Sequence, residues 1–190
     1  MPVKPRVLLL RAGPIATLAF FQENGPSMID HHIWSKLRTH LLELMENPPR
    51  VLILTGSQHH FAQGNQLEGP NQLFPDMDQL AKKKDRFKLA EMYRSMHDTV
   101  DILQRLPTVT IAAIEGECFE VGLELALGCD LRIASSNAQF RIAQIEQDLL
   151  PVMGGVHRLT NLIGPTRATE MILSRRTLNA QHALEWGLLN

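Results

Sequence analysis

The sequence has few cysteines, almost no net charge and no long apolar run, and each shortage argues against a class of protein. Its two cysteines, Cys118 and Cys129, form no CxxC pair, so they are a poor basis for a zinc site or a disulfide framework. We therefore expect reduced thiols in the cytoplasm. The formal net charge of -1 lacks the basic excess of nucleic-acid binders. No apolar stretch reaches the roughly 20 residues that cross a bilayer, and we expect neither nucleic acid nor membrane as a partner.

The eight histidines do not predict a metal site. The two adjacent pairs, His31-His32 and His59-His60, would diverge on a helix or point to opposite faces of a strand, so neither pair readily chelates one ion. We predict no metal. Two alternatives stand for His59 and His60: they move protons near neutral pH, or they are exposed loop residues.

The composition that is present is that of a soluble globular protein. Apolar residues make up 44% of the chain and charged residues 21%, an ordinary balance for a folded domain. A length of 190 residues suffices for one domain with a substantial core. We predict a single domain over residues 1–190. The apolar stretch at 7–10 is too short for a signal peptide and indicates a first strand.

Segments with strand and helix patterns alternate along the chain. The predicted strands are 6–10, 16–21, 51–55, 109–114 and 131–134, and the predicted helices are 28–46, 77–106, 119–128, 165–174 and 179–185. The turn signal at 12–14 joins the first two strands as a hairpin, and Ser27 is the predicted N-cap of the first helix. This alternation predicts an α/β fold with a mainly parallel sheet and right-handed crossovers.

Two blocks of sequence carry a family resemblance. In the first, Leu-Thr-Gly at 54–56 leads to Phe-Ala-Gln-Gly-Asn-Gln-Leu at 61–67. In the second, an ordered series of motifs includes Gly-Leu-Glu-Leu-Ala-Leu-Gly-Cys-Asp at 122–130 and Asn-Ala-Gln-Phe at 137–140. Over about 140 residues the chain resembles the crotonase (enoyl-CoA hydratase/isomerase) superfamily.

This resemblance implies a crotonase-like ββα superhelix, with a mainly parallel sheet flanked by helices. The sequence stops where family members usually continue into further C-terminal helices, so we expect a chain that is truncated relative to the family. The family also implies a homo-oligomer, a trimer or hexamer.

The resemblance further implies a substrate, an acyl-CoA or acyl-carrier-protein thioester, with no resident cofactor. Reactions of such thioesters through an enolate place negative charge on the carbonyl oxygen, which preset backbone N–H groups stabilise. By the family pattern these oxyanion donors are the amides of Asn65 and Val121. The positions implied to bind the thioester are Ala62, Gln63, Gly64, Leu67 and Gly122.

The chain departs from the family at the helix that follows. Glu120-Val121-Gly122 replaces three glycines. Glycine permits close ligand approach and unusual φ angles, whereas a β-branched valine restricts both. We therefore expect an oxyanion hole with a narrower mouth. Glu120 adds a carboxylate that repels a developing anion.

Glu124 and Gln144 are the predicted acid–base positions. Glu124 lies about one turn into the predicted helix, and helical side chains lean toward the N-terminus. Its alternative reading is an ordinary first-turn glutamate favoured by the helix dipole. Gln144 stands where hydratases have a second glutamate; an amide orients water but cannot accept its proton. Glu146 could replace it only with a shift of two residues.

The leading functional hypothesis is an enzyme of fatty acid metabolism that hydrates an enoyl thioester, or dehydrates the product, with Glu124 as the single acid–base group. A decarboxylase or another enolate-forming enzyme is the first alternative. The second is a non-catalytic binding module that keeps the fold, which Glu120, Val121 and Gln144 favour.

Overall fold

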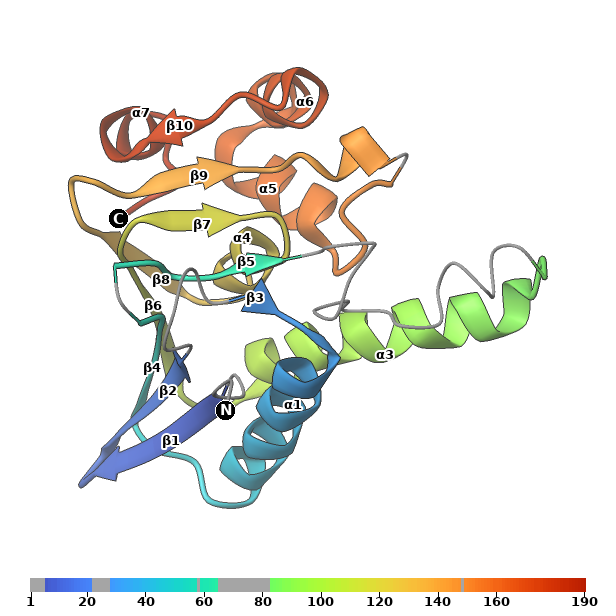
Figure 1. Cartoon of the computed structure of the whole chain (residues 1–190). Coiled ribbons are helices and arrows are strands. Elements are labelled where there is room, and N and C mark those ends of the chain that lie inside the picture. The colour runs from blue at the N-terminus through green and yellow to red at the C-terminus, as the bar shows by residue number, and fades with distance from the viewer. Residues whose placement is uncertain (1–5, 22–27, 58, 65–82, 148) are drawn as a thin grey trace, which may run out of the picture.

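The computed structural model describes residues 6–21, 28–57, 59–64, 83–147 and 149–190. The largest sheet contains β1 (Arg6–Ala12), β2 (Ile15–Phe21), β4 (Val51–Thr55), β6 (Val109–Ile114) and β8 (Leu131–Ala134), in the order β1-β2-β4-β6-β8 (Figure 1). β1 and β2 pair antiparallel, and every later neighbour pair is parallel. This confirms the predicted α/β fold with a mainly parallel sheet.

The helices α1 (His31–Glu46) and α3 (Arg86–Arg105) lie on one face of this sheet (Figure 1). Strand residues that face them alternate with the others and are buried, as Leu18, Leu52, Leu54 and Ala112 are. Apolar residues at helical spacing on α1 and α3 belong to the same core cluster. The core therefore forms where the apolar face of the strands, made by every second residue, packs against the apolar faces of the two helices, made by residues three or four apart.

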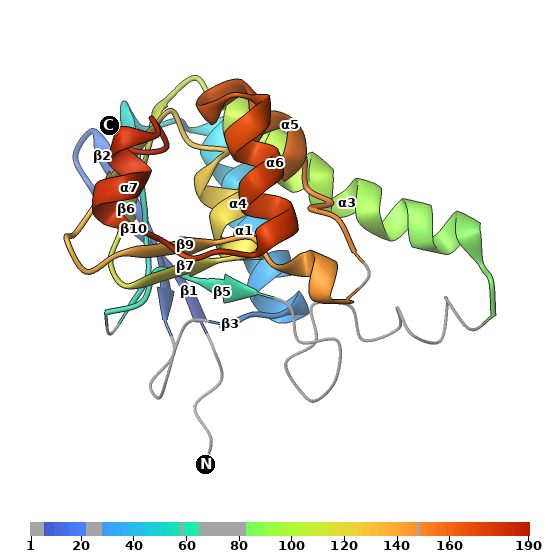
Figure 2. The ribbon, with the colours of Figure 1, turned by 90° about the horizontal axis from the view of Figure 1, so that it is seen from above.

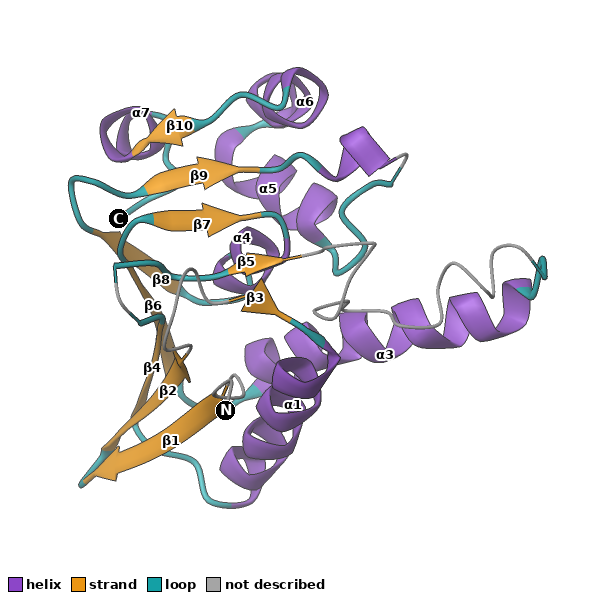
Figure 3. Cartoon of the chain, in the orientation of Figure 1, coloured by secondary structure: helices purple, strands orange, loops and turns teal. Residues whose placement is uncertain are grey.

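A second layer of short elements continues from the sheet (Figure 3). It contains strands β3 (Met28–Ile29), β5 (Gln63–Gly64), β7 (Glu117–Phe119), β9 (Gln139–Arg141) and β10 (Leu178–Asn179), and helices α4 (Val121–Ala126), η1 (Gln144–Gln147), α5 (Gly155–Ile163), α6 (Pro165–Ser174) and α7 (Ala180–Glu185). β9 lies between β10 and β7, and β3 pairs with β5. These short pairings hold the segments around α4 in place.

The N-terminal half of α3 extends away from the other described elements (Figure 1, Figure 2). Phe87 near its start is 73% exposed, and the buried residues of the helix begin at Met96. The fully buried residues of α3 therefore lie in its C-terminal half, and Met92 and Tyr93 before them pack half-buried against the core.

The predicted start of the first helix is wrong. Met28–Ile29 form β3, which pairs with Gln63–Gly64, so the chain at Met28 is extended. Asp30 is the N-cap, and its Oδ1 accepts the Ile33 N–H at 2.8 Å. Ser27, the predicted cap, lies outside the described residues.

The predicted long helix also begins later, at Arg86. Lys83 and Lys84 form a turn, in which Lys84 has a φ of 55°, and Asp85 caps the helix by accepting the Lys88 N–H at 3.2 Å. Residues 77–82 lie outside the described part of the chain.

The short helix predicted at 119–128 is limited to Val121–Ala126, because Phe119 belongs to β7 and Glu120 turns the chain with a φ of 48°. α5 was not predicted, because its Gly154-Gly155 start indicates a loop by sequence alone. None of the described helices is both long and apolar enough to cross a membrane.

Candidate active site

The start of α4 packs directly on the segment that leads into β5. A Cβ on Gly122 would lie 2.1 Å from the Ala62 carbonyl oxygen, so only glycine fits there. The same carbonyl accepts the Phe119 N–H at 3.1 Å. Ala62, Gly64, Val121 and Gly122, predicted as parts of one site, are thereby brought together. Gln63 donates from its amide to Glu117. Asn65 and Leu67 lie outside the described residues.

Val121 fills the space above Gly64. A Cβ on Gly64 would lie 2.3 Å from the Val121 Cβ and 2.7 Å from one of its methyl groups. Val121 is only 2% exposed. An isopropyl group therefore stands at the position where the family pattern has glycine.

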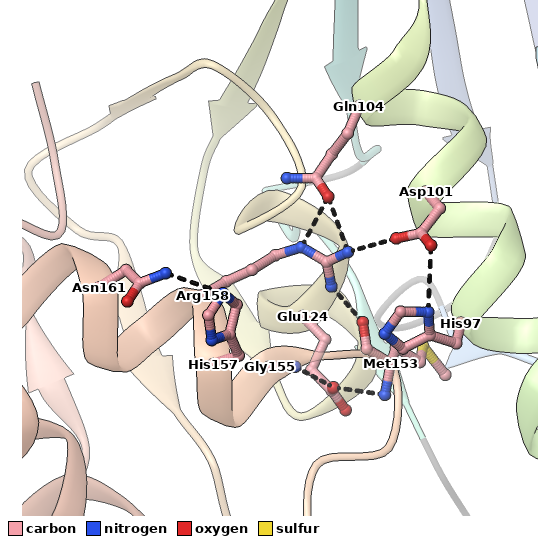
Figure 4. Close-up of polar contacts among 9 residues, drawn as sticks. All are labelled: His97, Asp101, Gln104, Glu124, Met153, Gly155, His157, Arg158 and Asn161. Carbon is pink, nitrogen blue, oxygen red and sulfur yellow. Dashed lines mark hydrogen bonds and ion pairs between the residues drawn. The ribbon is translucent and has the colours of Figure 1, made fainter.

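Glu124 is fully buried, and both its carboxylate oxygens accept hydrogen bonds; Figure 4 shows those that reach Oε2. The backbone N–H groups of Met153 and Gly155 donate to Oε2 at 2.8 and 3.0 Å. The side-chain amide of Gln144 donates to Oε1 at 3.0 Å. A Cβ on Gly155 would lie 2.6 Å from Oε2, so this glycine is what lets the backbone approach the carboxylate.

Burial raises the pKa of Glu124 from its usual 4.5 to about 7. The amides of Met153 and Gly155 and the positive charge of Arg158 act in the opposite direction. A carboxyl group with a pKa near neutrality both accepts and releases a proton at working pH, which is what general acid–base catalysis requires.

Gln144 reaches Glu124 from η1 and is 4% exposed. Because its Nε2 donates to Glu124, its Oε1 is left as an acceptor, and this buried oxygen has no hydrogen-bond partner in the part of the chain that the structure describes. Glu146, the alternative second carboxylate, is exposed and lies 3.4 Å from Arg175. This arrangement gives Glu146 no contact with Glu124.

Glu120, the residue before α4, carries a second carboxyl group, which is partly buried. Burial raises its pKa from 4.5 to about 7, against the attraction of Arg141, whose Nε lies 3.1 Å from Glu120 Oε1. Its positive φ falls where glycine is favoured, consistent with the glycine that the family pattern places there.

Sequence reasoning gave no role to Arg158, yet its guanidinium holds the segment that binds Glu124 (Figure 4). Nη1 donates to the Met153 carbonyl, and Nη2 donates to Asp101 Oδ1 at 2.9 Å. Nε and Nη2 also donate to Gln104 Oε1 at 3.0 and 2.8 Å. The sequence offers one sign of this role, an arginine three residues after Gly155. The partners of Arg158 on α3 lie more than 50 residues away in the chain.

His59, for which the sequence leaves two alternatives, is exposed, and the carboxylate of Glu115, 2.6 Å from its Nδ1, raises its pKa. His157, two residues after Gly155, is exposed and lies 3.0 Å from the Asn161 amide. Among the described residues, His97, Asp98 and Asp101 place ligand atoms within 4.8 Å of one another. Arg158 and His97 already engage the oxygens of Asp101, so we assign no metal there.

Comparisons with known proteins identify the family of the chain. Residues 28–190 match the family model described as enoyl-CoA hydratase/isomerase. The peroxisomal fatty acid beta-oxidation multifunctional protein MFP2 of Arabidopsis thaliana is 30% identical over 147 residues, which are 77% of this chain and 19% of that protein. The chain therefore spans less than a fifth of this relative's length.

Solved structures agree over almost the whole chain. Enoyl-CoA hydratase from Bacillus anthracis superposes with a TM-score of 0.83 at 28% identity, covering 96% of this chain and 68% of that one. A Thermobifida fusca structure with acetoacetyl-CoA bound gives a TM-score of 0.83 at 26% identity, covering 97% and 72%. With the family model matched over most of its length, this chain belongs to the enoyl-CoA hydratase/isomerase family.

Proposed function

We propose that this chain hydrates an enoyl thioester, or dehydrates the 3-hydroxyacyl product, with Glu124 as the single acid–base group. One observation carries the proposal: a buried carboxyl group with a pKa of about 7 lies beside the Gln144 amide, whose buried Oε1 has no hydrogen-bond partner among the described residues. Gln144 and the amides of Met153 and Gly155 bind the Glu124 carboxylate, and the Val152 amide also favours its ionised form. Oε1 of Glu124, which accepts from Gln144, is the proposed acceptor for a proton or a water molecule.

The arrangement suits a water molecule that donates one hydrogen to Glu124 and the other to Gln144 Oε1. Its oxygen attacks the β-carbon of the enoyl thioester while one proton passes to Glu124. The electron pair of the double bond moves to the carbonyl oxygen and forms an enolate. Glu124 then returns its proton to the α-carbon, which gives the 3-hydroxyacyl thioester and restores the carboxylate. Gln144 orients the water and takes no proton.

The enolate oxygen needs donors, and we propose the Val121 N–H as one of them. Val121 is the first residue of α4, where a backbone N–H has no acceptor within its helix. The amide of Asn65 is the proposed second donor. Coenzyme A as the carrier is supported by the acetoacetyl-CoA bound in the Thermobifida fusca structure.

The test is an assay of crotonyl-CoA hydration by the purified protein, in which the loss of enoyl absorbance measures the rate. Glu124→Gln keeps the shape and removes the base, so we expect about a 10²- to 10⁴-fold loss of kcat. Glu146→Gln is the matched control, because that exposed carboxylate pairs with Arg175, and it is expected to leave the rate unchanged. Equal rates for wild type and Glu124→Gln would refute the assignment of Glu124.

One observation favours a second candidate, a non-catalytic module that binds acyl thioesters. Val121 covers Gly64 and is 2% exposed, so the thioester oxygen has little room at that position. This candidate predicts no turnover but binding of an inert acyl-CoA analogue, measured by calorimetry. Absence of binding at near-millimolar analogue would remove both candidates.

A further inference from the structure

The Glu124 carboxylate is bound on one side by the same backbone segment that Arg158 holds on the other. Met153 and Gly155 donate their N–H groups to Glu124, and the carbonyl of Met153 accepts from Arg158 Nη1. Gly154, between them, has a φ of 84°, and its carbonyl accepts the Arg158 backbone N–H at 3.0 Å. The segment 153–155 therefore lies between two charged side chains of opposite sign.

Arg158 is itself held by the C-terminal half of α3. Its side chain is only 10% exposed, and Asp101 and Gln104 together accept three of its hydrogen bonds. Because the guanidinium is a planar fork with fixed donor directions, these bonds set its position and its orientation together. His97 lies behind Asp101, with 3.3 Å between its Nδ1 and Asp101 Oδ2.

We propose that Arg158 is a positioning residue, which places the Met153 and Gly155 amides on Glu124 and sets the proton affinity of that carboxyl group from α3. This inference rests on the proposed role of Glu124 as the acid–base group. Among the described residues, the charged and polar groups that face Glu124 are Arg158, Gln144 and the amides of Val152, Met153 and Gly155, while Asp101, Gln104 and His97 face Arg158. Arg158 favours the ionised Glu124 carboxylate in two ways. Its positive charge attracts the carboxylate, and its hydrogen bond to Met153 holds the amides that bind the carboxylate.

The sign of the effect follows from these contacts. Removing Arg158 withdraws a positive charge and frees the 153–155 segment, and both changes destabilise the ionised form. The Glu124 titration must therefore move upward from its midpoint of about 7. An opposite charge nearby typically changes acidity by a factor of ten or more, so we expect about a tenfold fall in the acid dissociation constant.

The experiment is a ¹³C NMR titration of protein labelled at the glutamate side-chain carboxyl carbons, with the Glu124 signal assigned by its loss in Glu124→Gln. Arg158→Gln is expected to raise the midpoint. Arg158→Lys keeps the charge but not the fork, and its midpoint is expected between those of Arg158→Gln and wild type. Arg86→Gln, which removes the same charge from the exposed start of α3, is expected to titrate as wild type does.

An unchanged Glu124 midpoint in Arg158→Gln overturns the proposal. A lysine variant that titrates as wild type does overturns the role of the fork, and one that matches Arg158→Gln overturns the role of the charge. If Arg158→Gln does not fold, Gln104→Ala removes one exposed acceptor and should raise the midpoint by less; no change there overturns the proposal as well. The titration needs no turnover, so a protein without hydratase activity but with the shifted midpoint refutes the proposed function alone.

Discussion

Two glutamates at the start of α4 reach the same acidity by different environments. Burial raises the pKa of both Glu120 and Glu124 to about 7. At Glu124, which has no exposed surface, mainly backbone amides oppose the rise in pKa. At Glu120 the rise is opposed by Arg141, whose side chain is 35% exposed. The comparison separates a carboxyl group bound by backbone amides from one bound by a partly exposed side chain. Only the first has the fixed geometry that proton transfer to a substrate requires.

The largest expected effect is on the pH dependence of stability in Glu124→Gln. Because the folded pKa of about 7 lies above the usual 4.5, the folded protein binds the proton more tightly. The free energy of unfolding therefore falls as the pH rises from 4.5 to above 7, by about 3 kcal/mol for this group. The variant lacks this decline, so it should match wild type at pH 4.5 and exceed it by about 3 kcal/mol above pH 7.

Urea unfolding of wild type and Glu124→Gln from pH 4.5 to above 7 measures the gap between their free energies of unfolding. Glu146→Gln is the control for an exposed carboxylate. A gap that stays constant with pH would mean that Glu124 titrates as it does in the unfolded chain, and would break the comparison.

Next in size is Gly155→Ala, which tests the backbone side of the comparison. The new Cβ would lie 2.6 Å from Glu124 Oε2 and 2.7 Å from its Cγ, so the carboxylate must move. A displacement of about 1 Å typically reduces turnover by about 100-fold, which the crotonyl-CoA assay measures. In a Glu124→Gln background the same change should reduce the rate no further; an equal loss there would show that Gly155 acts by another route.

A double-mutant cycle tests the Val121–Gly64 contact on the Glu120 side. Gly64→Ala would place a Cβ 2.3 Å from that of Val121 and is expected to lower the free energy of unfolding by about 1–3 kcal/mol. Val121→Gly removes the obstacle, so the two changes should couple by about 0.5–3 kcal/mol. Strictly additive effects in thermal or urea unfolding would contradict the contact.

Val121→Gly alone is also expected to tighten acyl-CoA binding, since it empties the space above Gly64.

The smallest effect is expected for Glu120→Gln. Its stability should also gain on wild type as the pH rises from 4.5 to above 7, since the pKa of Glu120 is raised. The gap should be smaller than for Glu124→Gln, because the Glu120 side chain is 12% exposed, so water reduces the desolvation that raises its pKa. A gap equal to that of Glu124→Gln in the same unfolding series would remove the distinction between the two sites.

The sequence predicted the main sheet and the placing of Glu124 beside Gln144, because both depend on long ordered patterns. Strands such as 51–55 and 109–114 have continuous apolar runs, and the glutamate follows from helix spacing within a long motif. Strands of two or three residues, such as β3, β5 and β10, were not predicted. Their pairing is decided by partners far away in the chain rather than by local preference.

The Arg158 interactions were missed for a related reason. Asp101 and Gln104 look like ordinary solvent-facing residues of a long helix, and Arg158 like one more charged residue of a short helix. Only the tertiary fold joins them, across more than 50 residues of chain. The boundary at Glu120 was missed because a non-glycine residue with a φ of 48° contradicts local preference.

The packed end of α3 links the position of this helix to the acidity of Glu124, because Asp101 and Gln104 on that end accept hydrogen bonds from Arg158. A tilt of the helix would thus be translated into a change in how readily Glu124 gives up its proton, without anything touching the carboxylate itself.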